Sequence, residues 1–321
     1  MNLDSLVKVA GDVGDVTPRD LEAGRRALGR AMQAADARVL AARRRRQRRR
    51  GLGALVGAAA AAAAVVVAPL LVAGPASAEE VLLATAAAAG EQPDETADAA
   101  YWHVVSEVDY PDTEPFRREI WQARTGVSVL RDASVAAEAA RAAGTTALDP
   151  ALIRTQGLDD SATFVVGGDV LTWSDLESLP TDAGELETVL RAKVGDHPSG
   201  DDNELWESVT GLLRESPASP ELRRALWQVA AGIPGVELLG SATDSAGREG
   251  TALERDELDQ GWYRMVYILD ATDGTLLETR NIDADGAVVY RSTALAQGPS
   301  ATAPAEQDPV CGPGADRARS C

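Results

Sequence analysis

Residues 43–78 read RRRRQRRRGLGALVGAAAAAAAVVVAPLLVAGPASA, and the rest of the chain is organised around this stretch. Seven arginines come directly before Gly51, and the 22 residues from Leu52 to Ala73 include no charged or amide side chain. A helix with a rise of ~1.5 Å per residue crosses a hydrocarbon core of ~30 Å with a run of this length. An open strand would leave its backbone groups unpaired in lipid. The stretch therefore predicts one transmembrane helix over residues 51–73.

The charges on either side of the span set its orientation. Arginine-rich flanks stay on the cytoplasmic side of a membrane, and the far flank of this span carries Glu79 and Glu80 instead. We therefore expect residues 1–50 to form a basic, partly helical cytoplasmic arm. The chain after the span is expected to lie outside the cell membrane.

Two alternatives to a single uncleaved anchor stay open. Ala76-Ser77-Ala78 has the small-x-small pattern of a signal-peptidase site, so cleavage after Ala78 is one of them. The other is a twin-arginine export signal at Arg49-Arg50. A leader of 78 residues is long for a cleaved signal, and this favours the anchor.

The net charge of the chain is divided at Gly51. Residues 1–50 carry a net charge of +7 and the remainder −26, which gives −19 overall. A basic arm suits anionic lipid headgroups, whereas an acidic exported part is repelled by nucleic acid. We expect the membrane as a partner and no nucleic acid.

Beyond the span, residues 74–296 alternate between helical and strand patterns. Ser77 and Glu80 form a capping box before a helix that ends near Gly90. Strands are expected at residues 101–105, 118–121, 126–130, 163–166, 170–173, 236–239, 250–253, 262–269, 276–282 and 287–293. Further helices are expected at residues 133–148, 149–157 (a short turn), 174–177 (a second capping box), 182–195, 205–213 and 219–229. The predicted class is α+β, with an antiparallel sheet, open or curved into a half-barrel, packed on helices and preceded by one transmembrane helix.

Residues 297–321 lose all periodicity and are rich in Pro, Gly, Ala and charge, which predicts a disordered tail. The chain's two cysteines, Cys311 and Cys321, lie in this tail. Outside the membrane they can form a disulfide, and the sequence leaves both the bridged and the free state open.

The sequence offers little for catalysis or metal binding. His103 lies among strand residues and His197 in a loop, and no Gly-x-Ser-x-Gly motif accompanies them. Residues 281–286 resemble the opening of a calcium loop, but Ser292 replaces the bidentate Glu at the twelfth position. A hairpin turn is the favoured interpretation. We predict no enzyme activity, no catalytic residue, no cofactor and no metal site.

Six tryptophans accompany only two phenylalanines: Trp102, Trp121, Trp173 and Trp262 in expected strands, Trp206 and Trp227 on expected helices. Large rings on a concave sheet can stack on a ligand, and large rings between a sheet and helices can equally fill a core. The core is favoured, because burial of apolar area is the commoner use of such rings.

Several short segments occur in an order that resembles a family of uncharacterised actinobacterial single-pass membrane proteins: residues 76–82, 171–182, 223–226, 233–236 and 244–250. Members of this family have an arginine-rich cytoplasmic arm and an exported domain, and the resemblance implies no catalytic residue. The order of strands and helices is also similar to periplasmic lipoprotein carriers and sigma-regulator sensor domains, in which a curved sheet holds an apolar ligand.

The leading hypothesis is a non-enzymatic membrane protein whose exported domain binds a lipid-like ligand or a protein partner. One alternative is anti-sigma-like signalling through residues 1–42. That arm contains no His or Cys, so a zinc-binding module is not supported. The other alternative is an exported hydrolase that uses clustered carboxylates.

Overall fold

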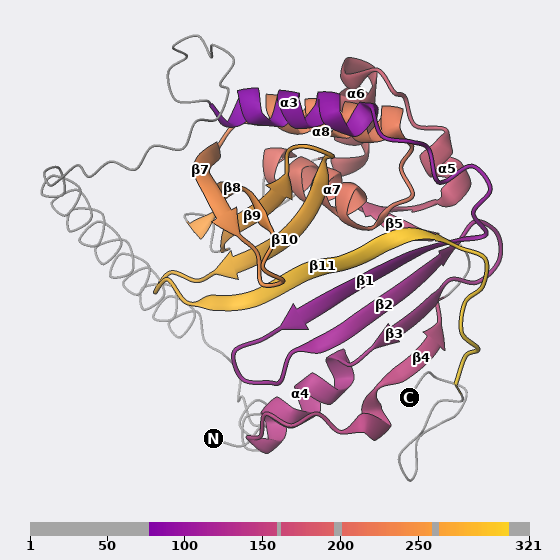
Figure 1. Ribbon diagram of the computed structural model, residues 1–321, viewed down its shortest axis with the longest axis vertical. Helices are drawn as coiled ribbons and strands as arrows, with labels where there is room; N and C mark the ends of the chain where they lie inside the picture. Colours follow the sequence, from indigo (N-terminus) through magenta and orange to yellow (C-terminus); the bar gives the residue numbers. More distant parts are fainter. Residues whose placement is uncertain (1–76, 159–161, 196–200, 259–262, 308–321) are drawn as a thin grey trace, which may run out of the picture. The chain divides into compact units, whose positions relative to one another are not determined.

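A computed structural model describes residues 77–158, 162–195, 201–258 and 263–307 (Figure 1). The chain divides into two compact units, Met1–Leu70 and Leu71–Cys321, and every described residue belongs to the second. Within these described ranges, no helix is both long and apolar enough to cross a membrane. The predicted arm and membrane helix lie outside the described residues, as do His197, Trp262, Cys311 and Cys321. Their structure and orientation stay predictions.

Nine strands form one open antiparallel sheet in the order β4-β3-β2-β1-β11-β10-β9-β8-β7. They are β1 Tyr101–Asp109, β2 Phe116–Ala123, β3 Val129–Asp132, β4 Arg154–Gly157, β7 Val236–Thr243, β8 Glu249–Asp256, β9 Arg264–Asp270, β10 Thr275–Ile282 and β11 Val288–Ser300. A separate hairpin consists of β5 Ala162–Val166 and β6 Asp169–Thr172. β1 lies between β2 and β11, so it joins the first strands of the domain to the C-terminal meander. The predicted α+β class with an antiparallel sheet is confirmed, and the sheet does not close into a barrel.

Most of the helices pack together on one face of this sheet (Figure 1). They are α3 Ala78–Gly90, α4 Ser134–Ala143, α5 Trp173–Glu177, α6 Ala183–Val194, α7 Asp201–Glu215 and α8 Pro220–Gly232, with a 3-10 turn at Pro150–Leu152. α3 packs along α8, and α7 contacts α8, β5 and β10. Their predicted caps are confirmed: Ser77 and Glu80 form the capping box of α3, Asp182 caps α6 and Ser219 caps α8.

Two predicted elements in the middle of the domain are wrong in kind. Residues 149–157 are not one helical turn, because the turn ends at Leu152 and Arg154–Gly157 pairs with β3 as an edge strand. Such a short strand owes its extended conformation to its partner, so its own residues carry almost no signal. The capping box after β6 consists of Thr172 and Asp175, two residues earlier than expected. Trp173 therefore begins α5 and does not end a strand.

Two further elements differ from the prediction only in length. α4 ends at Ala143 because Gly144 adopts a left-handed conformation with φ 67°. β11 extends to Ser300, past the predicted boundary at residue 296, and its last residues pair with β1 from Tyr101 onward. After β11 the chain reaches the outer edge of β4, where the Gln307 N–H donates to the Thr155 carbonyl oxygen at 2.9 Å.

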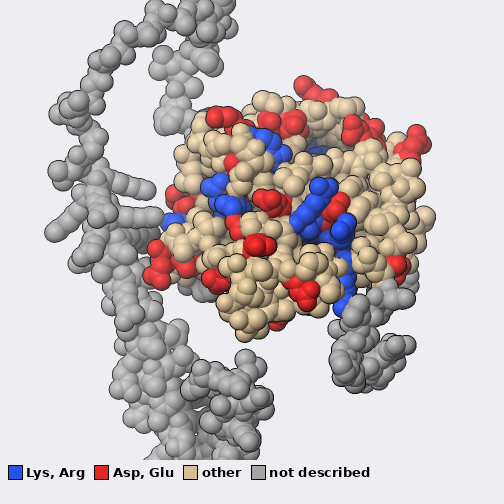
Figure 2. Space-filling view, turned by 60° about the horizontal axis from the view of Figure 1, so that its bottom comes forward, with Lys and Arg blue, Asp and Glu red and all other residues tan. Residues whose placement is uncertain are grey.

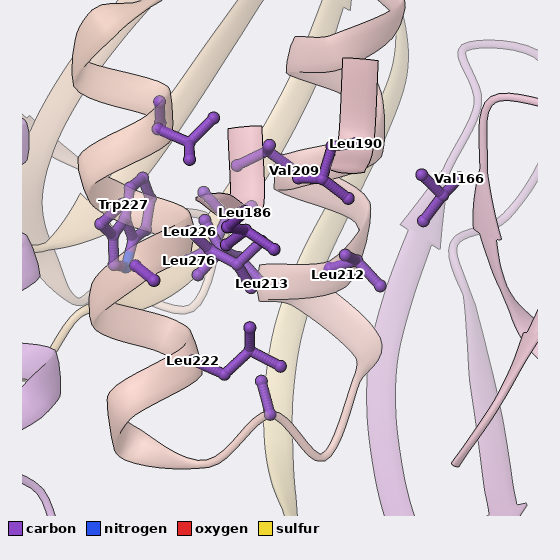
Figure 3. Packing of buried hydrophobic residues seen from close by; sticks show 14 of the residues in the cluster. Val166, Leu186, Leu190, Val209, Leu212, Leu213, Leu222, Leu226, Trp227 and Leu276 are labelled. Carbon is purple, nitrogen blue, oxygen red and sulfur yellow. The ribbon is translucent and has the colours of Figure 1, made fainter. Parts of the chain in front are cut away.

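The main core lies between the helices and the sheet (Figure 3). Leucines of α6, α7 and α8 meet Leu276 of β10 there, with the ring of Trp227 beside them. Full burial of a large apolar side chain stabilises the folded state by ~1.5–3 kcal/mol. Trp102, Trp173, Trp206 and Trp227 all belong to this core, so the core interpretation of the tryptophans is confirmed for these four.

The turn between β7 and β8 folds over the opposite face of the sheet. The Ser245 N–H donates to the Glu278 carboxylate at 2.7 Å, and the Arg248 guanidinium donates to the Ala294 carbonyl oxygen at 2.5 Å. The fully buried Asp244 carboxylate holds Arg248 through a hydrogen bond of 2.7 Å to its Nε. A small second core lies on this face: Ala252, Val266, Ile268 and Leu277.

Candidate functional site

The strongest candidate site is a cavity of about 220 Å³ at one end of the helix–sheet interface, called here the end cavity. Three segments that are distant in sequence form its wall: the loop after α3 with the start of β1, the link from α7 to α8 with the first turns of α8, and the β9–β10 turn. The last residues of β11 complete it through Gln297. Trp102, Arg223 and Asp273 line its interior.

Arg223 brings a positive charge to this cavity from the first turns of α8. Burial lowers the pKa of its guanidinium, and the charge of Asp273 opposes this shift. Arg223 forms no ion pair with a carboxylate of the described residues, and its Nη2 lies 3.5 Å from the Gly274 carbonyl oxygen, a weak hydrogen bond. The Arg118 guanidinium, by contrast, donates to Glu215 at 3.0 Å. The charge of Arg223 is therefore left for a ligand or for water.

Trp102 brings a buried donor with no acceptor. Its side chain is 6% exposed, and its Nε1 has no hydrogen-bond partner among the described residues. Gln122 lies opposite Trp102 in the β1–β2 ladder, fully buried, and both polar atoms of its amide also lack a partner. The same holds for the Ser216 hydroxyl, two residues before Ala218 of the cavity wall. Each buried polar group without a partner lowers the stability of the folded state by about 1–3 kcal/mol. The residues near the end cavity therefore have donors and acceptors that the chain itself does not use.

Carboxylates surround these donors without pairing with them. The Asp94 carboxylate accepts from the Thr96 N–H at 2.8 Å and from the Thr96 hydroxyl at 2.6 Å. The Asp273 carboxylate accepts from the Thr275 N–H at 2.8 Å. Both side chains are turned toward their own turns, while their charges, with that of Glu95, remain at the cavity wall.

Arg124 fixes the loop that forms one wall of the cavity. Its Nε donates to the Ala99 carbonyl oxygen at 3.0 Å and its Nη2 to the Thr96 carbonyl oxygen at 2.5 Å. The guanidinium lies 4.6 Å from the ring centroid of Trp173 and also binds Glu177 of α5. The wall is therefore tied to α5 by charged and cation–π contacts.

A second cavity of about 210 Å³, called here the α7 cavity, lies between α7 and β5. Phe164, Val165 and Leu212 form its apolar wall. Burial raises the pKa of the Glu207 carboxyl, which accepts a hydrogen bond of 2.7 Å from the Tyr267 hydroxyl. The polar groups of Glu207 and Tyr267 thus satisfy each other.

Glu215, at the edge of the α7 cavity, is held by two cations. Burial raises the pKa of its carboxyl, but Arg118 and Arg214 outweigh this effect, and the net shift is downward. Acidic and basic side chains also lie next to one another across the face shown in Figure 2. Paired charge is thus common among the described residues of this domain.

The residues weighed for chemistry in the sequence have structural roles where the structure describes them. The His103 ring stacks on Trp121 at 4.2 Å between centroids, and its Nε2 lies 3.2 Å from Glu119. Residues 283–286 form the β10–β11 turn, in which the Asp283 carboxylate accepts from the Asp285 and Ala287 N–H groups. The hairpin interpretation is confirmed. No group of three His, Cys, Asp or Glu residues in the described ranges is placed to hold a metal ion.

The sequence predicts no site residue, and no pattern in it predicts the end cavity. A weak signal is present: Arg223 lies three residues after Pro220, the first residue of a helix, where the helix dipole disfavours a cation. Trp102 carries no such signal, because an indole in a strand looks the same with or without a partner for its N–H.

The sequence matches no protein-family model and no curated protein. Among solved structures, the chain is similar to the Pseudomonas aeruginosa MucA/MucB complex, with 15% identity, a TM-score of 0.30, and coverage of 71% of this chain and 58% of that one. It is also similar to an uncharacterized conserved protein from Thermus thermophilus, with 9% identity, a TM-score of 0.31, and coverage of 70% and 89%. A LolA superfamily protein from Nitrosomonas europaea gives 8% identity, a TM-score of 0.22, and coverage of 71% and 96%.

These likenesses are distant, and this chain spans 58% of the length of its match in the MucA/MucB structure. A LolA superfamily protein is among these distant structural neighbours. The resemblance to an actinobacterial membrane family stays a prediction.

Proposed function

We propose that this chain is a membrane-anchored binding protein. Residues 51–73 span the membrane, and the exported domain binds a ligand or a partner without catalysing a reaction. The observation that carries the proposal is the end cavity, which is lined by Arg223, a cation with no ion pair among the described residues, and by Trp102, a residue whose buried indole N–H has no partner there. Donors without acceptors favour a ligand that supplies acceptors.

The dimensions of the cavities favour a small polar ligand or the end of a partner chain over a lipid. The end cavity and the α7 cavity measure about 220 and 210 Å³. A third, more open hollow of about 700 Å³ is lined mainly by charged side chains: Arg191, Asp201, Asp202, Arg255 and Asp256. Pockets for drug-sized ligands span ~300–1,000 Å³ and are mostly apolar. Side chains of the main core fill the space between the helices and the sheet, where a carrier of this architecture would hold an acyl chain.

The contacts of His103 speak against one kind of hydrolase, a serine or cysteine enzyme that uses this histidine as its base. Its ring is held by Trp121 and Glu119, and neither of these residues offers a hydroxyl or thiol nucleophile. A triad needs such a group within hydrogen-bond distance of the base.

Native mass spectrometry of the full-length protein, extracted from membranes in mild detergent, tests the proposal. Gln297→Trp places a large ring at the wall of the end cavity, and Leu295→Trp places the same ring at a 41% exposed position of the same strand. We expect a non-covalent ligand or partner to remain bound to the wild type and to Leu295→Trp and to be lost from Gln297→Trp. A molecule retained equally by both variants would contradict binding in the end cavity.

A further inference from the structure

We infer that the end cavity recognises a single carboxylate group, either of a small organic acid or of a peptide C-terminus, and discriminates against phosphate. The inference rests on the proposed function, because it names the chemistry of a ligand for that same cavity.

The Arg223 guanidinium and the Trp102 indole N–H are both hydrogen-bond donors, and the first is positively charged, so together they favour an acceptor with a negative charge. The guanidinium of Arg223 is a planar fork of N–H donors that matches the two oxygens of a carboxylate. The indole N–H of Trp102 is a donor only. A carboxylate, which only accepts hydrogen bonds when ionised, can satisfy both groups, whereas an amine would satisfy neither.

The position of α8 adds to this preference. Pro220, the first residue of this 13-residue helix, lines the cavity, so the positive end of the helix dipole lies beside it. A cation at Arg223 is unfavourable there in isolation and becomes favourable when an anion lies between it and the helix end.

The carboxylates of the wall limit how much negative charge the cavity accepts. Asp94, Glu95 and Asp273 all line it, against the single cation of Arg223. Inorganic phosphate carries about 1.5 negative charges at neutral pH and would meet three like charges, whereas a carboxylate carries one. The lining as a whole is therefore negative, so a carboxylate is held only through direct hydrogen bonds to Arg223, and an anion with more charge is repelled more strongly.

The alternative occupant is water. Buried waters commonly satisfy polar groups that the chain leaves unpaired, and a cavity of about 220 Å³ has room for several. Water alone would fill the site without preferring one anion to another, so a test of anion selectivity separates the two possibilities.

The test uses the full-length protein in detergent micelles, labelled with ¹⁵N-tryptophan, and observes the indole N–H resonance of Trp102, identified by its absence in Trp102→Phe. The probes are acetate, N-acetyl-alanyl-alanine, the C-terminal amide of the same dipeptide, and phosphate, all at equal ionic strength. We expect the free acids to shift the Trp102 resonance in a saturable manner, and the amide and phosphate to leave it in place. The other indole resonances report that the protein remains folded.

Substitutions assign the charge that selects the carboxylate. Arg223→Gln removes charge-assisted hydrogen bonds and is expected to weaken carboxylate binding by about 10- to 100-fold. Arg224→Gln, which removes the neighbouring arginine outside the cavity lining, is the matched control and is expected to bind as the wild type does. Should Trp102→Phe fail to fold, the rise in melting temperature with acid concentration gives a second readout, present in the wild type and reduced in Arg223→Gln.

The affinities of acetate and of N-acetyl-alanyl-alanine show which kind of molecule supplies the carboxylate. Tighter binding of the dipeptide acid than of acetate indicates a peptide C-terminus, and equal binding indicates small organic acids; both support the inference. It is overturned if phosphate or the amide competes equally with the acids, or if no probe moves the Trp102 resonance. A retained native ligand that lacks a carboxylate but is lost in Gln297→Trp would overturn this inference alone and leave the proposed function standing.

Discussion

Gly274 positions two residues of functional interest through a single turn. It adopts φ +79°, and a Cβ at this position would lie 2.5 Å from the Cβ of Ala89 in α3. Its carbonyl oxygen accepts a hydrogen bond of 3.0 Å from the Trp227 Nε1 and lies near the Arg223 guanidinium. The β9–β10 turn therefore fixes a core ring and borders the end cavity, and only glycine allows both the conformation and the approach.

We expect Gly274→Ala to lower the free energy of unfolding by about 2–4 kcal/mol, because backbone strain and a close contact add. Gly286→Ala is the control. Gly286 has φ +89° in the β10–β11 turn, but a Cβ there would meet nothing within 4 Å. Its loss should be smaller, about 1 kcal/mol, from backbone strain alone. Denaturant unfolding of both variants measures the difference, and equal losses would show that the approach to α3 adds nothing.

Glu278 makes the stability of the domain depend on pH. Burial raises the pKa of its carboxyl, but hydrogen bonds from Ser245, Thr293 and Arg280 outweigh this effect and lower it overall. A group whose pKa is lower in the folded state stabilises the protein fully above the unfolded value of about 4.3. This stabilisation is lost as the pH falls through the lower folded-state pKa.

Glu278→Gln should therefore lower the free energy of unfolding at pH 7 by about 1–3 kcal/mol and have a smaller effect near pH 3. Urea unfolding from pH 7 down to pH 3 measures both. Glu237→Gln, at an exposed position of β7, serves as the control and should change little at either pH. A loss from Glu278→Gln that stays constant over this range would show that the ionised carboxylate is not the stabilising species.

At the scale of elements, the loop after α3 depends on Arg124 for its conformation. Residues 91–100 contain no helix or strand, and the contacts of Arg124 with the Thr96 and Ala99 carbonyl oxygens link the loop to α5. A loop held by a few polar contacts opens locally at a lower free energy than the core beneath it.

We expect Arg124→Met to accelerate amide hydrogen exchange in residues 91–100 by about 10-fold or more, without a comparable change in α7 or α8. The substitution removes the charge-assisted hydrogen bonds and keeps an unbranched apolar stem. Arg117→Met is the matched control, because its side chain is 58% exposed on the adjacent β2. Hydrogen exchange measured by mass spectrometry tests whether Arg124 holds the loop. Unchanged exchange in residues 91–100 would mean that other contacts hold it.

Local signals in the sequence were sufficient for most of the helices and for the hairpins formed by β7 to β11. Ser77, Asp182 and Ser219 predict helix starts correctly because a cap satisfies backbone groups within one turn. Asp273-Gly274 predicts a turn for the same local reason. The edge strand β4 and the end cavity depend instead on partners brought together from distant segments. No local pattern records that Trp102 and Arg223 line the same cavity.

At the scale of the whole molecule, the division of charge predicts on which side of the membrane each part of the chain lies. Residues 1–50 carry +7 and the remainder −26, and the only uncharged run long enough to span a bilayer lies directly after the arginines at 43–50. In the proposed topology, the acidic domain lies outside the membrane and is repelled by anionic headgroups, which leaves its cavities accessible to soluble ligands.

Single-cysteine labelling in intact cells tests this arrangement. With Cys311 and Cys321 replaced by serine, one cysteine is placed either at Ser5 of the basic arm or at the exposed Ala305 after β11. We expect a membrane-impermeant maleimide to label Ala305→Cys in intact cells and Ser5→Cys only after lysis, because the arginines hold the arm inside. Labelling of Ser5→Cys alone in intact cells would show that the orientation is the opposite of the proposed one. Labelling of both variants only after lysis would argue against export. The mass of the mature chain separates an anchor from a cleaved leader, since cleavage after Ala78 would leave Glu79 as the first residue.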